Sequence, residues 1–218
     1  MSDVQTIQSQ IKRVRNSLPS SVRLIAVTKY VSTVEVETAY RAGMRDFGES
    51  RIQDAESKIE ALSHCPDVQW HLIGHLQSNK AKLAVQLFDW IHSVDSLKLA
   101  QRLNRLAIEQ NKRPNICLQV KIRPDPAKFG WEPESLMQDL QSLCALSQLS
   151  ISGLMVILPQ GLSSDEAQAA FEDTAKLAMQ IRSHPDVHLP LRELSMGMSQ
   201  DYPLAIAAGA TMIRLGSI

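Results

Sequence analysis

The feature that most constrains this chain is a strand-then-helix alternation that repeats to its last residues. Short segments rich in aliphatic and β-branched residues predict strands, and each is followed by a segment with apolar residues at helical spacing. One such unit occupies about 25–30 residues, and turn or capping residues separate the units. The predicted strands are residues 23–28, 46–49, 68–74, 89–94, 115–122, 151–158, 191–195 and 211–215.

Eight such units predict an α/β fold of one of two kinds. Eight parallel strands with eight helices close the TIM-type (β/α)8 barrel, whereas an open doubly wound sheet is built from the same units. A doubly wound dinucleotide fold would carry Gly-x-Gly-x-x-Gly after its first strand, and this chain has no such motif there. We therefore predict a single-domain TIM-type barrel over residues 1–218.

The N-terminal segment, residues 3–17, predicts a helix that precedes the first strand. Every strand of a (β/α)8 barrel is paired with an outer helix, but the last predicted strand ends at Leu215 and the sequence stops three residues later. We expect the N-terminal helix to fill this last outer-helix position, between the eighth and first strands. Its apolar stripe consists of Val4, Ile7, Ile11 and Val14.

Composition argues against several classes of function. Lys+Arg and Asp+Glu both number 23, so the formal charge is zero and a dedicated surface for nucleic acid or an anionic membrane is not expected. No apolar run approaches the ~20 residues of a membrane span, and the polar N-terminus lacks the apolar region of a signal peptide. The three cysteines form no Cys-x-x-Cys motif, which fits a reducing cytosol. We predict a cytoplasmic monomer.

Two lysines fall where such a barrel carries its chemistry, at the carboxyl ends of strands. Lys29 follows the first predicted strand, and Lys121 lies near the end of the fifth. A lysine at a strand end can simply extend its ammonium group into water. Alternatively, its amine can form an imine with an aldehyde held in a pocket. Position alone leaves both interpretations open.

The last two predicted strand ends suggest a phosphate site. Phosphate groups in these barrels are often bound after strands seven and eight, beside a helix N-terminus. The seventh strand is followed by Gly197, Met198 and Ser199, where Ser199 is expected to begin a helix, and the eighth by Gly216 and Ser217. Each loop alone could be an ordinary cap or turn. Their expected convergence is what favours an anion site.

Arg214 is the one charged residue of the last predicted strand. Such a charge needs a partner, either a barrel acid such as Glu49 or Glu193 or an acceptor on a ligand. His71 and His75 have a spacing that would suit a metal only on a helix, and their strand context argues against zinc. We predict no metal site.

Long segments of the sequence resemble the pyridoxal phosphate homeostasis family. The resemblance covers nearly the whole chain and is most specific in the segments Leu-Gln-Ser-Asn-Lys and Ser-Met-Gly-Met-Ser. The matching segments are residues 24–29, 46–53, 70–82, 88–96, 152–157 and 194–216. The resemblance implies a barrel like the N-terminal domain of bacterial alanine racemase, with pyridoxal 5′-phosphate (PLP) bound as an imine.

The resemblance also implies roles for individual residues. Lys29 corresponds to the imine lysine, and Arg214 to the residue that faces the pyridine nitrogen. The phosphate contacts correspond to Ser199, Gly216 and Ser217. Further residues expected at the cofactor are Met198, Gly48, Ser50, Ile73 and Met155.

Two features depart from the family pattern. Ser50 stands where the family usually has asparagine, so its contact with the cofactor differs from that of its relatives. The family also usually continues beyond the segment that ends this sequence at Ser217 and Ile218, so we expect a less firmly anchored phosphate loop.

The family's role is balancing the PLP supply, and the sequence gives that role a physical basis. A racemase needs a second base, which the alanine racemase fold takes from an additional domain that we do not expect here. An arginine opposite the pyridine nitrogen stays protonated and keeps that nitrogen unprotonated, which weakens the ring as an electron sink. We therefore predict a PLP carrier that is not an enzyme, whose partners are PLP and, transiently, apoenzymes that accept it. The alternatives are a small PLP-dependent amino-acid racemase and a phosphosugar enzyme with a Schiff-base lysine.

Overall fold

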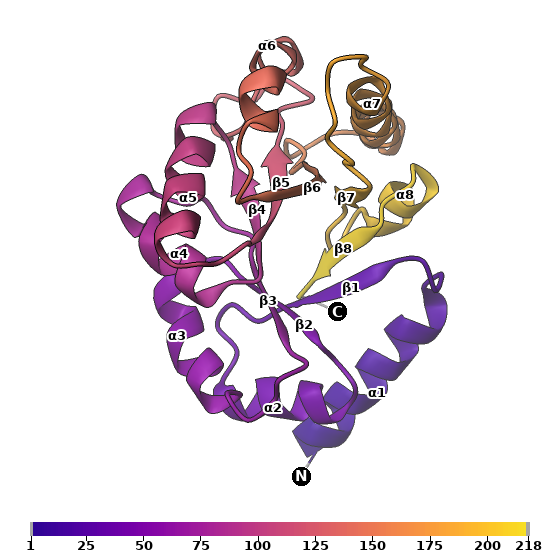
Figure 1. Ribbon diagram of the computed structural model, residues 1–218. Helices are drawn as coiled ribbons and strands as arrows, with labels where there is room; N and C mark the ends of the chain where they lie inside the picture. The colour runs from indigo at the N-terminus through magenta and orange to yellow at the C-terminus, as the bar shows by residue number, and fades with distance from the viewer. Residues whose placement is uncertain (1, 217–218) are drawn as a thin grey trace.

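The computed structural model describes residues 2–216, and its eight parallel strands close into a barrel (Figure 1). Neighbouring strands follow the order of the sequence, and β8 pairs with β1 to complete the ring. The strands are β1 (Arg23–Val27), β2 (Asp46–Glu49), β3 (Gln69–Leu72), β4 (Trp90–Val94), β5 (Asn115–Gln119), β6 (Ser150–Met155), β7 (Glu193–Ser195) and β8 (Met212–Leu215). The predicted TIM-type barrel is thus confirmed, and the doubly wound sheet is wrong.

Helices surround the strands on the outside of the barrel (Figure 1). They are α1 (Ser2–Ser17), α2 (Thr33–Arg41), α3 (Ile52–Ala61), α4 (Ala81–Leu87), α5 (Leu97–Glu109), α6 (Pro133–Cys144), α7 (Ser164–Arg182) and α8 (Tyr202–Ala207), and one 3₁₀ turn, η1 (Ser78–Lys80), precedes α4. Helix α6 begins with proline, whose fixed φ suits a first helical position.

Serine side chains cap two of the outer helices, with Ser32 before α2 and Ser163 before α7. Each cap exchanges hydrogen bonds with the glutamate three residues later, so two backbone N–H groups are satisfied at once. Sequence periodicity identifies the helices well, but it leaves the choice between adjacent serine and threonine caps open.

The N-terminal helix α1 takes the outer position between β8 and β1, as predicted. Its residues Ile7, Ile11 and Val14 line a small apolar cavity of about 190 Å³ together with Leu24 of β1 and Leu215 of β8. Figure 1 shows α1 beside β1 and α2. The side chain of the remaining predicted stripe residue, Val4, lies outside the described side chains. Helix α1 therefore covers the outer face at the β8–β1 closure.

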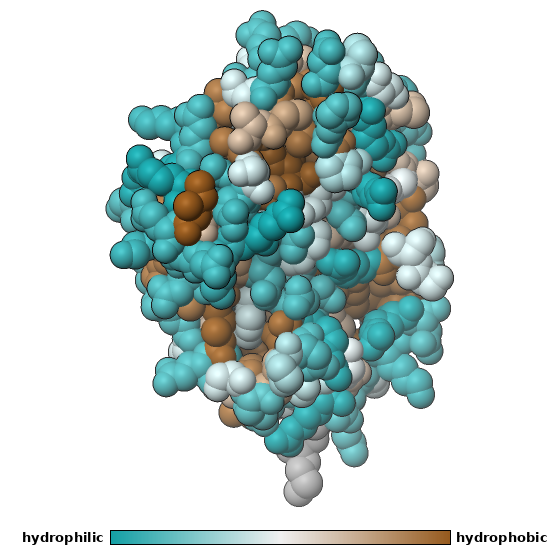
Figure 2. Space-filling view, viewed as in Figure 1, coloured by the Kyte–Doolittle hydropathy of each residue, from teal (hydrophilic) through white to brown (hydrophobic). Residues whose placement is uncertain are grey.

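The apolar core has two parts, because alternate strand residues face opposite sides of the barrel wall. The larger part lies between strands and helices, and it includes Leu24 and Ile213 from the two strands that close the ring. A smaller cluster lies inside the barrel and consists of Ile25, Trp90, Cys117, Met155 and Met212. In the view of Figure 2 the outer surface is mostly hydrophilic, with apolar atoms visible between the helices.

Nothing in the part of the chain that the structure describes resembles a membrane-crossing helix, because no described helix is both long and apolar enough. Cys65, Cys117 and Cys144 are all free thiols. Burial raises the pKa of the Cys117 thiol inside the barrel, so this side chain behaves as a small apolar residue.

Candidate cofactor-binding site

A pocket of about 530 Å³ opens where the carboxyl ends of the strands meet. This volume suits a ligand of cofactor size. Residues at the ends of six different strands, β1, β2, β3, β6, β7 and β8, contribute to its wall, so only the closed barrel brings them together. The lining residues are Val27, Lys29, Ser50, Ile73, Gly74, Ile157, Met198, Ser199, Gln200, Asp201, Arg214 and Gly216.

Lys29 lines this pocket and Lys121 does not. The Lys29 side chain has no hydrogen bond or ion pair with any described residue, so its amine is available to a ligand. Lys121 instead forms an ion pair with Glu132, with 2.8 Å between Nζ and the carboxylate. An amine engaged by a carboxylate outside the pocket is not positioned to attack a ligand aldehyde. The geometry therefore favours Lys29 as the reactive lysine.

A buried ion pair supports the chain just before Lys29. Lys58 of α3 donates to Glu49 Oε1 at 2.7 Å and to the backbone carbonyl of Thr28 at 2.6 Å. The Thr28 hydroxyl also donates to Glu49 Oε1 at 2.5 Å, and Glu49 is fully buried. Two of these contacts hold Thr28, the residue that precedes Lys29, which leads us to expect that the pair aims the lysine stem at the pocket.

Replacing Lys58 with methionine is expected to destabilise the fold by about 3–5 kcal/mol, because Glu49 would remain buried without its cation. Urea unfolding of the protein without cofactor measures the loss. Changing Glu49 to glutamine in the same protein should restore much of the stability, since no buried charge then lacks a partner. Lys82→Met, at an exposed position, is the matched control and should change the unfolding free energy little. Equal effects of Lys58→Met and Lys82→Met would contradict the role of the pair.

Two glycine-containing loops, after β7 and β8, also contribute to the pocket. A side chain at Gly197, which has φ +94°, would place its Cβ 2.7 Å from the Ala205 Cβ. The Gly216 N–H points toward Ser199 Oγ at 3.5 Å, and Asp201 accepts the Met198 N–H at 2.6 Å. Ser199 and Gly216 both line the pocket, so a serine hydroxyl and a backbone N–H lie side by side in its wall, the kinds of donor that bind a phosphate group.

The predicted start of the helix in this region is wrong. Helix α8 begins at Tyr202 with Asp201 at its N-cap, so Ser199 lies in the loop before the helix. The reason is local: Asp201 binds the Met198 N–H across the turn, which makes residues 198–201 a tight loop instead of a first helical turn. The serine still reaches the pocket, but from this loop rather than from a helix cap.

Arg214 enters the pocket from inside the barrel and is only 4% exposed. Its guanidinium donates to the Ser195 carbonyl at 2.7 Å, to Ser195 Oγ at 2.8 Å and to the Val156 carbonyl at 2.9 Å. Neither acid considered from the sequence pairs with it: Glu49 binds Lys58, and Glu193 accepts from Thr211. Burial lowers the pKa of Arg214 to about 10, so the group is still charged at neutral pH.

The structure separates the other predicted site residues into two groups. Ser50, Ile73 and Met198 line the pocket. Gly48 and Met155 lie deeper, below the pocket: a Cβ on Gly48 would meet Ile73 Cδ1 at 3.3 Å, and Met155 is fully buried in the interior cluster. Gly48 thus leaves space for the pocket wall without touching the pocket. Ser217 lies outside the described residues.

The two histidines examined for metal binding point in different directions. His71 lies inside the barrel and bonds to His92 and Asp46, whereas His75 lies at the rim, 3.2 Å from the Asp95 carboxylate. Among the described residues, no group of three or more histidine, cysteine or acidic side chains could hold a metal.

The sequence reasoning missed Asp201, which both lines the pocket and orders the loop that carries Met198 and Ser199. Its position two residues after Ser199 and just before a helix was an available signal, because aspartate is favoured at such turns and caps. The backbone at Gly74 was also missed. A Cβ there would come within 2.0 Å of the Ser50 carbonyl oxygen, so glycine is needed for the two strand ends to approach.

The fold and the pocket together define a cofactor barrel of the alanine racemase type. The sequence pattern of the alanine racemase N-terminal domain family matches residues 2–218, and the chain belongs to that family. Within it, the chain belongs to the pyridoxal phosphate homeostasis proteins. It is 55% identical to the protein of that name from Synechocystis sp. over 93% of this chain and 92% of the relative. It is 40% identical to the protein of that name from Pseudomonas aeruginosa, over 91% of this chain and 84% of the relative.

Solved structures give the same relationship. PipY, a COG0325 family member from Synechococcus elongatus PCC7942, superposes with a TM-score of 0.93 at 50% identity without PLP, covering 97% of this chain and 98% of PipY. The structure of the same protein with PLP bound superposes with a TM-score of 0.92. Alanine racemase from Clostridium difficile shares only the fold, with a TM-score of 0.76 at 14% identity, and this chain covers 58% of it.

Proposed function

We propose that the protein binds PLP in the pocket at the carboxyl ends of its strands and serves in PLP homeostasis. The observation that carries this proposal is the convergence of an unpaired lysine, a glycine–serine phosphate cradle and a buried arginine on one pocket. The names of the relatives, and the PLP bound to the PipY structure, support the same conclusion. The function we infer is that of a cytoplasmic, monomeric carrier formed by one barrel domain.

The residues fit PLP at three points of the cofactor. Lys29 supplies the amine that condenses with the aldehyde, forming a carbon–nitrogen double bond and releasing one water. Ser199 and Gly216 supply donors for the phosphate, and we infer that Ser217 adds a third. Ser50, Ile73 and Met198 would contact the cofactor, and Gly48 and Met155 would support the floor beneath it.

Arg214 supports a carrier rather than a strong catalyst. Bound PLP supplies an electron sink to PLP enzymes, and that sink is strongest when the pyridine nitrogen is protonated. A guanidinium that stays charged at neutral pH donates to the nitrogen and disfavours its protonation. The protein would therefore hold PLP firmly and pass it to apoenzymes that lack it, without turning over a substrate of its own.

The visible spectrum of the purified protein tests the proposal. With PLP added and free cofactor removed by gel filtration, we expect a yellow protein with a Schiff-base absorption band and one PLP per chain. A protein that remains colourless after loading would overturn the proposal. Incubating the loaded protein with several L-amino acids and measuring their D-isomers separates the carrier from a racemase, since a carrier should give no enantiomer above background.

Pyridoxal without its phosphate is expected to bind at least ~100-fold more weakly than PLP. Each charge-assisted hydrogen bond to the phosphate contributes ~1.5–3 kcal/mol, so the loss of two bonds already reaches that factor. Equilibrium titration followed by absorbance measures both affinities, with the same aldehyde present in each ligand as the internal control. Similar affinities would show that the aldehyde, not the phosphate, anchors the cofactor.

A further inference from the structure

A chain of hydrogen-bonded side chains crosses the barrel interior below the pocket. It begins at Arg214, whose Nη1 lies 2.8 Å from Ser195 Oγ, and continues from Ser195 Oγ to His92 Nδ1 at 2.8 Å. His92 Nε2 then lies 2.9 Å from His71 Nδ1, and His71 Nε2 lies 3.0 Å from Asp46 Oδ1. Arg214 lines the cofactor pocket, whereas Asp46 lines a separate pocket formed with the loop before β1, so the chain connects two sides of the molecule.

The arginine end fixes the direction of the first hydrogen bond in this chain. A guanidinium has donors and no acceptor, so Arg214 must donate to Ser195 Oγ. The serine hydroxyl keeps its own proton, which it can donate to an unprotonated Nδ1 of His92. In that arrangement the proton of His92 sits on Nε2 and is donated to His71 Nδ1, and the proton of His71 sits on Nε2.

The aspartate end and the neutral charge of both rings fix the direction of the remaining bonds. An ionised carboxylate only accepts hydrogen bonds, so His71 must donate its Nε2 proton to Asp46. Both histidines are fully buried, and burial lowers the pKa of each, that of His92 well below its usual value. A neutral His71 protonated on Nε2 can only accept at Nδ1, so a neutral His92 donates to it from Nε2 and accepts the Ser195 hydroxyl proton at Nδ1, and this single tautomer satisfies all four contacts.

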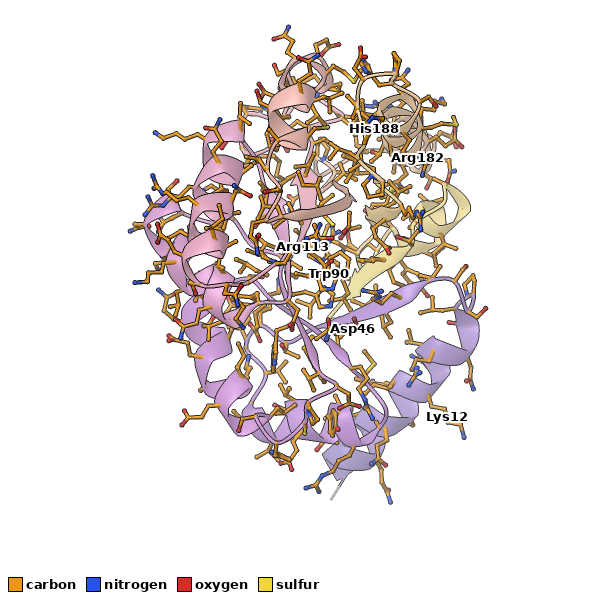
Figure 3. The ribbon with its side chains drawn as sticks, viewed as in Figure 1. Lys12, Asp46, Trp90, Arg113, Arg182 and His188 are labelled. Atoms are coloured by element: carbon orange, nitrogen blue, oxygen red, sulfur yellow. The ribbon has the colours of Figure 1, made fainter. Side chains whose placement is uncertain are left out.

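The surroundings of the chain keep it rigid. His71 stacks on Trp90 with 5.7 Å between ring centroids and an angle of 11°, and His92 lies against the same indole. Arg23 lies over Trp90 and 3.8 Å from the Asp46 carboxylate. Figure 3 shows Asp46 and Trp90 in the middle of the barrel. The charged groups that act on the two histidines are Asp46, Asp89, Arg23 and Arg214.

We propose that Ser195, His92, His71 and Asp46 are positioning residues that hold Arg214 as a fixed, charged donor to the cofactor ring and couple the pocket to the Asp46 carboxylate. This inference rests on the proposed function, in which Arg214 faces the pyridine nitrogen. The chain adds to the stabilisation of this buried arginine by Asp201, whose carboxylate lines the same pocket and favours the charged guanidinium: three neutral groups transmit the polarisation between Arg214 and the more distant Asp46. Asp46 is then a remote determinant of cofactor retention.

The tautomers of the two interior histidines test the chain without any cofactor. The protein has six histidines, and His71 and His92 are the fully buried ones among the described residues. In ¹⁵N-labelled protein at neutral pH, both should give the signature of a neutral ring protonated on Nε2. His71→Gln and His92→Gln assign the two signals. An Nδ1-protonated ring or an imidazolium at either position would overturn the proposed direction.

Loading with PLP tests the coupling. In the wild-type protein the Nε2 resonance of His71 should shift when PLP is bound, although His71 does not line the pocket. In Ser195→Ala, which keeps the arginine bond to the Ser195 backbone carbonyl, that shift should vanish and PLP should dissociate about 3–10-fold faster, the worth of one hydrogen bond. Asp46→Asn should lower the PLP affinity in the same direction.

Thr174→Val is the matched control, because Thr174 is also fully buried and its hydroxyl bonds only within α7. It should retain both the His71 shift and the wild-type dissociation rate. If His71 does not respond to PLP in the wild-type protein, or responds equally in Ser195→Ala, the coupling is overturned. Failure of PLP to bind at all would instead defeat the proposed function, while the tautomer measurement would still decide the direction of the chain.

Discussion

Replacing Lys29 with alanine is expected to abolish the Schiff-base absorption of the PLP-loaded protein and to leave its fold intact. The Lys29 side chain is exposed and contacts no described partner, so its removal costs little packing or hydrogen bonding. Among the residues that the structure describes, it is also the one lysine that lines the pocket. Absorbance after PLP loading and the thermal unfolding midpoint measure the two effects separately.

Lys121→Ala is the control for this substitution, because Lys121 also follows a strand but is held by Glu132. It should keep the absorption band. Reduction of the loaded wild-type protein with borohydride, followed by peptide mass mapping, should place the pyridoxyl group on Lys29. An adduct on Lys121, or an unchanged spectrum in Lys29→Ala, would show that the pocket lysine is not the one that binds the aldehyde.

The barrel could be predicted from the sequence because its main determinant is a repeated local pattern. Hydrophobic periodicity and capping residues identify each strand and each helix from local sequence. Eight strand–helix units in succession can bury their apolar faces in only a few arrangements. The strand Asp46–Glu49 was predicted to the residue. Strand ends that depend on tertiary pairing were predicted less accurately. Strand β3 stops at Leu72, two residues before its predicted end, because Ile73 and Gly74 belong to the pocket wall.

The rim of the candidate site could also be predicted, since residues at strand ends converge in any closed barrel. The side-chain contacts inside the barrel could not be predicted in this way. Strand alternation puts Arg214 on the same face of β8 as Met212, but only the closed ring shows that this face points inward, where Arg214 bonds to Ser195 and Ser195 bonds to His92. Those partners come from strands that are far apart in sequence, and residue spacing carries no information about such contacts. The pairing of Lys58 with Glu49 was also missed, although the two residues are only nine positions apart, because it depends on how α3 packs against the end of β2.

Helix α1 is the element whose loss should affect stability most. Val14 is 7% exposed, and Ile7 and Ile11 are partly buried against the outer core at the β8–β1 closure. Burying each aliphatic side chain fully contributes ~1.5–3 kcal/mol, so this stripe is comparable with a domain's whole net stability of ~5–15 kcal/mol before ordering entropy is subtracted. Without α1, Leu24 and Leu215 would be open to water. Deletion of residues 1–18 should therefore unfold or aggregate the protein.

Two point substitutions make this prediction sharper than the deletion. Val14→Asp should lower the unfolding free energy by more than ~3 kcal/mol, because it removes apolar packing and buries an unpaired carboxylate. Lys12→Asp lies on the same helix, but Lys12 is exposed and projects away from the barrel (Figure 3), so its effect should stay within ~0.5 kcal/mol. Chemical denaturation of both variants measures the difference. Equal effects, or a truncated protein that stays monomeric with an unchanged melting temperature and still binds PLP, would show that the β8–β1 closure is stable without the helix.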